Sequence, residues 1–288
     1  MWNALSMQLA EVTGNDFTIK ERIAVTGGDI NDCFCISDDT DRLFVKTNDR
    51  ENLPMFEAEA ESLIRLAEAE AIEVPQVIHI GTVKDHAVLV LNYLPLKPLD
   101  DDSAYTLGVQ LARLHQWGEQ QEFGFDLDNY IGYTVQPNNW HRKWCKFFAE
   151  QRIGWQLQLA SEKGMQFGDV DNIIENVKSI LSSHQPRPSL LHGDLWQGNT
   201  GLSPLGPVVF DPASYWGDRE CDIAFTELFG RFPDTFYQGY NAQYPLSEHY
   251  ENRRDLYNLY HVLNHCNMFG GHYLTQAENM ILRLELNA

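Results

Sequence analysis

Two short segments of the chain carry side chains whose types and spacing suit phosphoryl transfer. The first, 192–199, follows a short apolar run, has a turn-type composition and contains Asp194 and Asn199. The second, 208–212, is a β-branched and aromatic run that leads into Asp211. Both segments place polar groups at the end of an extended stretch, and we expect the three side chains to lie together.

Each polar group in this pattern has a chemical task. Asp194 would accept the proton of an attacking hydroxyl, while Asn199 and Asp211 would hold Mg²⁺ against nucleotide phosphates. The Asp-x4-Asn spacing is the one that protein kinases use. Gly193 replaces the arginine of the kinase His-Arg-Asp motif, and Asp-Pro-Ala at 211–213 replaces Asp-Phe-Gly. Either segment alone is more often an ordinary turn or strand end, but both in this order favour a kinase-like site.

Composition limits the class of protein. The chain has 288 residues, 43% of them hydrophobic and 22% charged, which is typical of a soluble globular protein with one large domain or two lobes. The formal net charge of −20 argues against nucleic acid or an anionic membrane as a partner. No apolar run has the length of a membrane span, and no signal peptide is expected. Five cysteines without a Cys-x-x-Cys pair favour reduced thiols in a cytoplasmic enzyme.

The first part of the chain is expected to be an antiparallel sheet with one main helix. The helix, 54–69, has apolar residues at helical spacing, and a short amphipathic helix at 2–12 precedes the sheet. The strands are expected at 17–25, 33–36, 42–46, 74–80 and 86–92.

Three features of this part suit phosphate binding. Gly27 and Gly28 lie in a strand–turn–strand segment whose N–H groups could cover phosphates, although a Gly-Gly turn is more often a plain hairpin. Lys46 ends a strand. Glu59 falls on the apolar face of the 54–69 helix, where an acidic group needs a partner. We therefore expect a Lys46–Glu59 ion pair that holds the lysine against the α- and β-phosphates.

A connector with Pro95 and Pro98 follows the last of these strands and marks the boundary between two lobes. We expect an ATP-binding lobe at 1–95, with a hinge at 92–95, and a catalytic and substrate-binding lobe at 96–288. An ordinary linker is the alternative for this segment. In a nucleotide-binding protein the hinge backbone would face the adenine edge, through Asn92, Tyr93 and Leu94.

The second part of the chain is expected to be mostly helical. Ser103 is a candidate N-cap, 119–137 is a long polar excursion, and 140–163 is a helix with an aromatic face. Asp222 is placed to cap a helix over 223–229. In a kinase-like fold Asp222 would also hold the catalytic-loop backbone, and His192 would support the same loop.

Taken together, these motifs closely resemble the fructosamine kinase or ketosamine-3-kinase family, in the aminoglycoside-phosphotransferase branch of kinase-like folds. A His-Gly-Asp core at 192–194 alone would indicate only the wider superfamily. The extensions Leu-Trp-x-Gly-Asn at 195–199 and Asp-Pro-Ala-Ser-Tyr at 211–215 indicate ketosamine kinases. The resemblance covers essentially the whole chain, with further counterparts at 27–31, 44–46, 56–59, 111–115, 148–153 and 263–270.

The resemblance implies an α+β, two-lobed, protein-kinase-like fold. It also implies ATP-dependent phosphorylation of the 3-hydroxyl of a sugar ketoamine, such as fructoselysine or a ribulosamine, as deglycation repair. Asp194 would be the base, Asn199 and Asp211 would hold Mg²⁺, and Trp196 would be a stacking wall for the sugar. The expected partner is a small ketoamine or a glycated protein, with no nucleic acid or membrane and with the oligomeric state open.

One residue departs from the family pattern, and two alternative functions remain open. Asp29 stands where some family members carry a cysteine that links two protomers as a redox switch, so that control is doubtful here, although Cys33 is close in sequence. The first alternative is another small-molecule kinase, acting on choline, an amino alcohol or an aminoglycoside. The second is a binding protein without activity, which the complete set of kinase-like residues disfavours.

Overall fold

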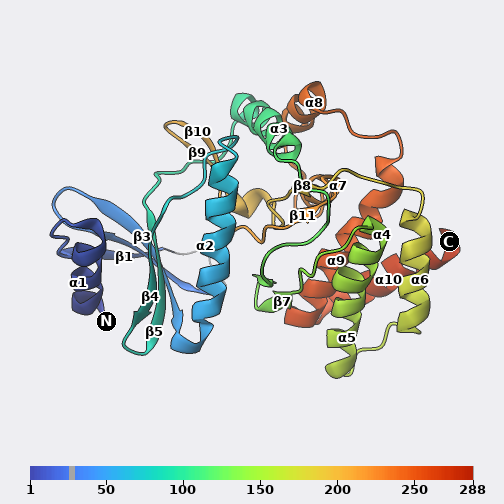
Figure 1. Ribbon diagram of the computed structural model, residues 1–288, viewed down its shortest axis with the longest axis horizontal. Coiled ribbons are helices and arrows are strands. Elements are labelled where there is room, and N and C mark those ends of the chain that lie inside the picture. Colours follow the sequence, from blue (N-terminus) through green and yellow to red (C-terminus); the bar gives the residue numbers. More distant parts are fainter. Residues whose placement is uncertain (26–29, 288) are drawn as a thin grey trace.

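The computed structural model describes residues 1–25 and 30–287, so the expected phosphate-binding residues Gly27 and Gly28, and also Asp29, lie outside the described residues. Figure 1 shows two lobes, one built on a sheet and one mostly helical. This is the α+β architecture that the sequence predicts. Within the described part of the chain, no helix is both long enough and apolar enough to cross a membrane.

The sheet of the first lobe is antiparallel throughout and has the strand order β1-β2-β3-β5-β4. Its strands are β1 (Glu21–Val25), β2 (Asp32–Ser37), β3 (Arg42–Asp49), β4 (Val77–Val83) and β5 (His86–Asn92). They begin and end within a few residues of the expected ranges, except that β1 is shorter at its start. All residues of β5 from Ala87 to Leu91 are apolar and buried, so this strand is covered on both faces of the sheet.

Two helices cover the two faces of the sheet (Figure 1). Helix α1 (Trp2–Thr13) packs with Val88 and Val90 of β5, whereas α2 (Leu53–Glu68) packs with the alternate residues of the same strand. Successive side chains of a strand point to opposite faces, so one central strand supplies both cores. The sequence predicts both helices.

The second lobe surrounds a large apolar core. Its helices are α3 (Asp101–Gln116), α4 (Trp144–Phe147), a π-helical turn η2 (Phe148–Gly154), α5 (Trp155–Glu162), α6 (Val170–Leu181), α7 (Glu220–Phe225), α8 (Asp234–Gln243), α9 (Tyr250–Phe269) and α10 (His272–Asn287). Three small hairpins or strand pairs are formed by β6 (Asn129–Ile131) with β7 (Thr134–Gln136), β8 (Ser189–Leu190) with β11 (Trp216–Gly217), and β9 (Thr200–Ser203) with β10 (Gly206–Val209).

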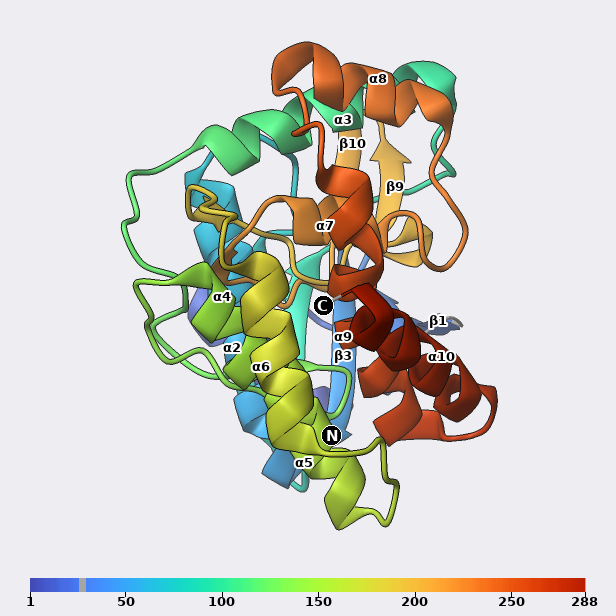
Figure 2. The ribbon, with the colours of Figure 1, turned by 90° about the vertical axis from the view of Figure 1, so that its right-hand side faces the viewer.

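Helix α8, which the sequence did not predict, lies directly on α3 (Figure 2). Two glycines permit this contact. A Cβ at Gly108 would lie 2.1 Å from the carbonyl oxygen of Phe236, and a Cβ at Gly239 would lie 2.1 Å from that of Tyr105. The two backbones therefore touch without side chains between them.

Several helix boundaries differ from the expectation. Ser103 is not the N-cap of α3, because Asp100 takes that position and Ser103 is the third residue of the helix. The helix expected at 140–163 begins at Trp144 and contains a π-helical turn. Asp222 lies within the first turn of α7, which begins at Glu220, so it is not an N-cap.

The excursion at 119–137 contains the β6–β7 hairpin, whose turn contacts both sides of the cleft between the lobes. The hydroxyl of Tyr133 donates to the carbonyl oxygen of Ile30 (2.8 Å), just after the undescribed residues of the glycine-rich segment. On the other side, a Cβ at Gly132 would lie 2.5 Å from the sulfur of Met268 on α9. The hairpin belongs to the helical lobe by sequence and links it to the sheet.

The cap of α3 gives a stability prediction. Asp100 Oδ1 accepts from the N–H of Ser103 (2.9 Å), and the Ser103 hydroxyl accepts from the N–H of Asp100 (2.8 Å). Asp100→Ala removes the cap and should lower the free energy of unfolding by about 1 kcal/mol in urea denaturation. Ser103→Ala keeps the cap itself and should cost less. A larger loss for Ser103→Ala would show that the cap is assigned to the wrong residue.

Candidate active site

Asp222 holds the backbone at the start of the 192–199 loop by hydrogen bonds. Its Oδ2 accepts from the N–H of His192 (2.8 Å) and its Oδ1 from the N–H of Gly193 (2.9 Å). His115 lies 3.1 Å from Oδ2 through Nε2. Burial opposes the charge of Asp222, but His115 and the backbone N–H groups outweigh burial and lower its pKa. A buried carboxylate thus fixes the start of the loop.

A glycine is required after His192 because the loop packs directly on the segment that follows Asp211. Gly193 has φ 83°, and a Cβ there would lie 2.0 Å from the carbonyl oxygen of Ala213. The N–H of Ala213 donates to the carbonyl oxygen of His192 (2.9 Å). The two segments singled out from the sequence are therefore bonded to each other, with no room for the arginine that protein kinases carry at this position.

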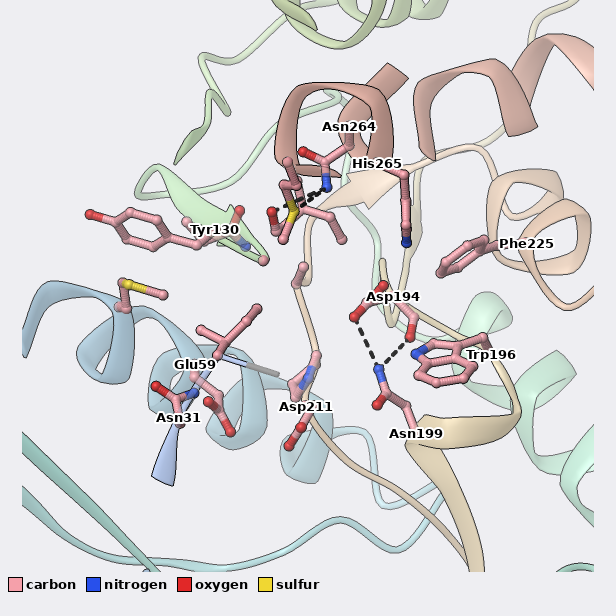
Figure 3. Close-up of a pocket in the computed structure, with 18 of the residues that line it drawn as sticks. Asn31, Glu59, Tyr130, Asp194, Trp196, Asn199, Asp211, Phe225, Asn264 and His265 are labelled. Atoms are coloured by element: carbon pink, nitrogen blue, oxygen red, sulfur yellow. Dashed lines mark hydrogen bonds between the residues drawn. The ribbon is translucent and has the colours of Figure 1, made fainter. Parts of the chain in front are cut away.

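Asp194 and Asn199 are joined across the loop (Figure 3). The Asn199 Nδ2 donates both to the backbone oxygen of Asp194 (2.8 Å) and to its Oδ2 (3.0 Å). Asp194 is half-buried, and burial together with the nearby charge of Asp211 raises its pKa to about 7, against the hydrogen bond from Asn199. A carboxyl with such a pKa can take up and release a proton near neutral pH.

Lys46 lies buried between two carboxylates, one from each lobe. Its Nζ donates to Glu59 Oε1 (2.7 Å) and to Asp211 Oδ1 (2.6 Å). Burial opposes the charge of the lysine, but Asp211 and Glu59 outweigh it and raise its pKa above the usual value. The expected Lys46–Glu59 ion pair is present, and the bond to Asp211 is a partner that the sequence did not predict.

Asp211 has a left-handed backbone conformation with φ 56°, which is rare for a residue other than glycine. Such strain persists only where the surrounding structure enforces it, and it is concentrated at functional sites. The flanking backbone is held on both sides: the N–H of Phe210 donates to the carbonyl oxygen of Asn199 (3.1 Å), and Ala213 is bonded to His192. The carboxylate of Asp211 is aimed into the cleft from this fixed turn (Figure 3).

The donor atoms at this point suit Mg²⁺. Because the Nδ2 of Asn199 is bonded to Asp194, its Oδ1 is turned to the other side of the amide. A carbonyl-type oxygen and the carboxylate of Asp211 are hard ligands of the kind that Mg²⁺ prefers alongside phosphate oxygens and water.

Two cavities, of ≈420 Å³ and ≈540 Å³, meet at these residues. The larger lies against the sheet and is lined by the expected hinge residues Asn92, Tyr93 and Leu94. The smaller lies against the helical lobe. Asp194 lines this cavity and not the larger one. Both cavities share a junction made of Cys33, Lys46, Trp196, Asn199 and Asp211.

Trp196 forms the wall between the two cavities and is 38% exposed. Its indole lies over the backbone of Gly198, where a Cβ would lie 2.2 Å from the ring. The Trp-x-Gly spacing in the loop therefore has a steric reason, because only glycine leaves room for the ring at this position. The structure places the expected sugar-stacking residue at the junction.

The sequence did not predict the aromatic cluster that lines the far side of the smaller cavity. Its rings come from the turn after α7, from α9 and from α10, and lie 4.6–6.4 Å apart between centroids. The members are Phe229, His265, Phe269 and Tyr273. In the sequence, the segment 263–270 has a counterpart in the family pattern, but its residue types predict no binding role. Nothing in the sequence shows that two helices and the turn after a third bring these rings together.

His265 is held in one tautomer within this cluster. Its Nδ1 lies 2.8 Å from the carbonyl oxygen of His261, which can only accept, so Nδ1 carries the proton. Burial lowers the pKa of His265, so the ring is neutral and its Nε2 is an acceptor. Figure 3 shows the ring pointing into the cavity, on the side of Asp194.

The fold and these residues define a phosphotransferase of the kinase-like class. A crystal structure of a thermostable aminoglycoside phosphotransferase mutant, in a ternary complex with AMP-PNP and hygromycin B, shares the fold with a TM-score of 0.65 at 13% identity, covering 99% of this chain and 100% of that one. At that identity the likeness concerns the fold alone.

Within this class, the chain belongs to the fructosamine kinase family, whose model matches residues 1–287. A Vibrio parahaemolyticus protein named as a probable ketoamine kinase is 58% identical over 285 residues, covering 99% of both chains. The crystal structure of a Haemophilus somnus protein assigned as a fructosamine-3-kinase has a TM-score of 0.94 and 41% identity, covering 99% of this chain and 97% of that one. The protein is accordingly an ATP-dependent phosphotransferase.

The raised pKa of Asp194 predicts a cost in stability. An aspartate with an ordinary pKa of 3.8 and a folded-state pKa of about 7 binds more protons when folded, so stability falls as pH rises between these values. Asp194→Asn keeps an acceptor for Asn199 and removes this cost. We expect the variant to be more stable than the wild type by on the order of 2 kcal/mol above pH 7, with no difference near pH 4. Equal stability across pH 4–8 in chemical denaturation would contradict the raised pKa.

Proposed function

We propose that the protein phosphorylates the 3-hydroxyl of a sugar ketoamine, a fructosamine or ribulosamine, with MgATP as donor. This proposal rests on the way the cleft is divided into two cavities with different lining residues. Asp194 lines only the smaller cavity, whereas Lys46, Asn199 and Asp211 line both. A base on the acceptor side and phosphate-holding groups at the junction match an in-line transfer from one cavity to the other.

In this proposal the larger cavity takes the nucleotide. The adenine lies against the hinge backbone of 92–94, where the first lobe, 1–95, gives way to the second, 96–288. Lys46, kept charged by Glu59, neutralises the α- and β-phosphates, and Gly27 and Gly28 remain proposed phosphate-binding residues on the basis of the sequence alone. Mg²⁺, held by Asn199 and Asp211, would offset the phosphate charge that develops during transfer.

The smaller cavity takes the sugar, with one face of its ring against Trp196. Since Asn199 occupies Oδ2 of Asp194, the Oδ1 of that carboxylate is left to accept a hydrogen bond from the acceptor hydroxyl. As the hydroxyl oxygen bonds to the γ-phosphorus, the bond from that phosphorus to the bridging oxygen of ATP breaks, and the hydroxyl proton passes to Asp194. The transition state is loose, so positioning and charge neutralisation supply most of the catalysis.

A deglycation role follows from the resemblance, because a 3-phosphate makes such an adduct spontaneously labile and releases the amine. The acceptor is a free ketoamine or a glycated protein. We place the reaction in the cytoplasm, because all five cysteines, Cys33, Cys35, Cys145, Cys221 and Cys266, are free thiols.

An acceptor screen tests the reaction. The protein is incubated with ATP, Mg²⁺ and fructoselysine, a ribuloselysine analogue, choline or kanamycin, and the products are analysed by mass spectrometry. We expect phosphate on the ketoamines alone, and a kcat that is about 10²–10⁴-fold lower in Asp194→Asn, which keeps the shape but removes the base. Phosphate on choline or kanamycin would leave the fold and mechanism in place but overturn the substrate. Unchanged turnover in the variant would overturn the base.

We also propose that the aromatic cluster holds the amine part of the ketoamine. A secondary ammonium next to the sugar is a cation, and the faces of aromatic rings attract cations. Phe269 is 56% exposed, lines the smaller cavity, and its ring centroid lies 5.7 Å from that of His265. The Nε2 of His265 adds an acceptor for a hydroxyl or an ammonium proton.

Phe269→Ala should therefore raise the KM for a ketoamine about 2- to 30-fold and leave the KM for ATP unchanged, the range expected for one cation–π contact. Tyr105→Ala removes a similarly exposed ring on α3, far from the cleft residues, and serves as the control. Equal KM values for Phe269→Ala and the wild type in steady-state kinetics would exclude this role.

A further inference from the structure

A chain of buried side chains runs from the π-helical turn η2 to the backbone just after Asp211. The Nη2 of Arg152 donates to Oδ1 of Asn138 (2.7 Å), and Nδ2 of Asn138 donates to Oδ1 of Asn129 (2.9 Å). Nδ2 of Asn129 then donates to the carbonyl oxygen of Ser214 (2.8 Å). The chain thus ends three residues beyond the aspartate.

Gln136 joins this chain from the β6–β7 hairpin. Its Nε2 donates to Oδ1 of Asn129 (2.7 Å) and to the carbonyl oxygen of Ala213 (3.1 Å), and its Oε1 accepts from the hydroxyl of Tyr260 (2.7 Å). The four side chains Arg152, Asn138, Asn129 and Gln136 are at most 1% exposed. Two successive backbone carbonyls after the strained aspartate therefore depend on side-chain amides for their hydrogen bonds.

The guanidinium sets the direction of every bond in the chain. Arginine can only donate, so the oxygen of Asn138 must face it, which turns the amino group of Asn138 towards the oxygen of Asn129. The amino group of Asn129 is then the one that faces Ser214. Turning any one of these amides over would bring two donors or two acceptors face to face. The orientation of the Asn129 amide at Ser214 is therefore set by Arg152.

Arg152 is unusual because it is fully buried without an acidic partner. It forms no ion pair within residues 1–25 and 30–287, and its Nε has no hydrogen-bond partner there. The guanidinium instead lies over the rings of Tyr215 (4.0 Å) and Phe147 (4.6 Å). A buried cation without a carboxylate is costly. The π-helical turn that carries it is a feature that occurs frequently at functional sites.

We propose that Arg152, acting through Asn138, Asn129 and Gln136, positions the carboxylate of Asp211 for the metal. This inference rests on the proposed function, in which Asp211 holds Mg²⁺. The left-handed φ of 56° at Asp211 has to be enforced from both sides. The catalytic loop holds the N–H groups of Phe210 and Ala213, and the amide chain holds the carbonyls of Ala213 and Ser214. All four are positioning residues: Asn129 also lines the smaller cavity, whereas Arg152, Asn138 and Gln136 line neither cavity.

Metal affinity tests this directly. The binding of Mn²⁺ to the protein with AMP-PNP is measured from the EPR signal of free Mn²⁺. Gln136→Met has similar volume and cannot donate to Ala213, and we expect it to weaken Mn²⁺ binding about 2- to 10-fold, the equivalent of one buried hydrogen bond. Tyr260→Phe removes only the hydrogen bond that Oε1 of Gln136 accepts. It should weaken Mn²⁺ binding less than Gln136→Met does, and the fold should stay intact.

Gln151→Met is the matched control. Gln151 lies beside Arg152 in the same π-helical turn and is also a buried amide. It makes two hydrogen bonds, against three for Gln136, and both go to the backbone of Asn139. It should lower the melting temperature as much as Gln136→Met does and leave Mn²⁺ affinity unchanged. Equal Mn²⁺ affinity in the two variants would overturn the positioning role. If Asp211→Asn itself left Mn²⁺ affinity unchanged, the metal role in the proposed function would fail instead.

Discussion

The ion pairs of Lys46 are the interaction on which the cleft depends. One buried ammonium is shared by Glu59 of the sheet lobe and Asp211 of the helical lobe, at 2.7 and 2.6 Å. Two carboxylates around one cation leave a net negative charge, and a negatively charged nucleotide has to enter the same space. In the proposed function, further positive charge therefore has to arrive with the phosphates, so nucleotide and metal binding would depend on each other.

The sequence predicted those features of the structure that depend on local residue patterns. Glu59 could be chosen over its neighbours because its place on the apolar face of a helix required a buried partner, and Lys46 is that partner. Short apolar runs bounded by turn residues predicted the strands of the sheet, and periodicity predicted α1 and α2. The error at Ser103 has the same local basis: Asp100 and Ser103 form a reciprocal pair, and either residue type can cap a helix.

What the sequence could not predict depends on contacts between distant segments. Asp211 as a second partner of Lys46 joins residues 165 positions apart, and the bond between Tyr260 and Gln136 spans 124. The left-handed turn at Asp211 is likewise invisible in the residue types, since aspartate before proline is usually an extended strand end. Helix α8 was missed because its contact with α3 depends on glycines, which lower helical propensity while permitting the close crossing.

The bond from Tyr133 to Ile30 has a consequence for the timing of turnover. Because the β6–β7 hairpin also carries Asn129 and Gln136, it connects the segment at Ile30 with the turn after Asp211, and a widening of the cleft would strain this connection. In the proposed function, release of ADP would then also loosen the carboxylate of Asp211, which is proposed to hold the metal. ADP and its metal ion would leave together, because the hairpin would couple the release of one to the release of the other.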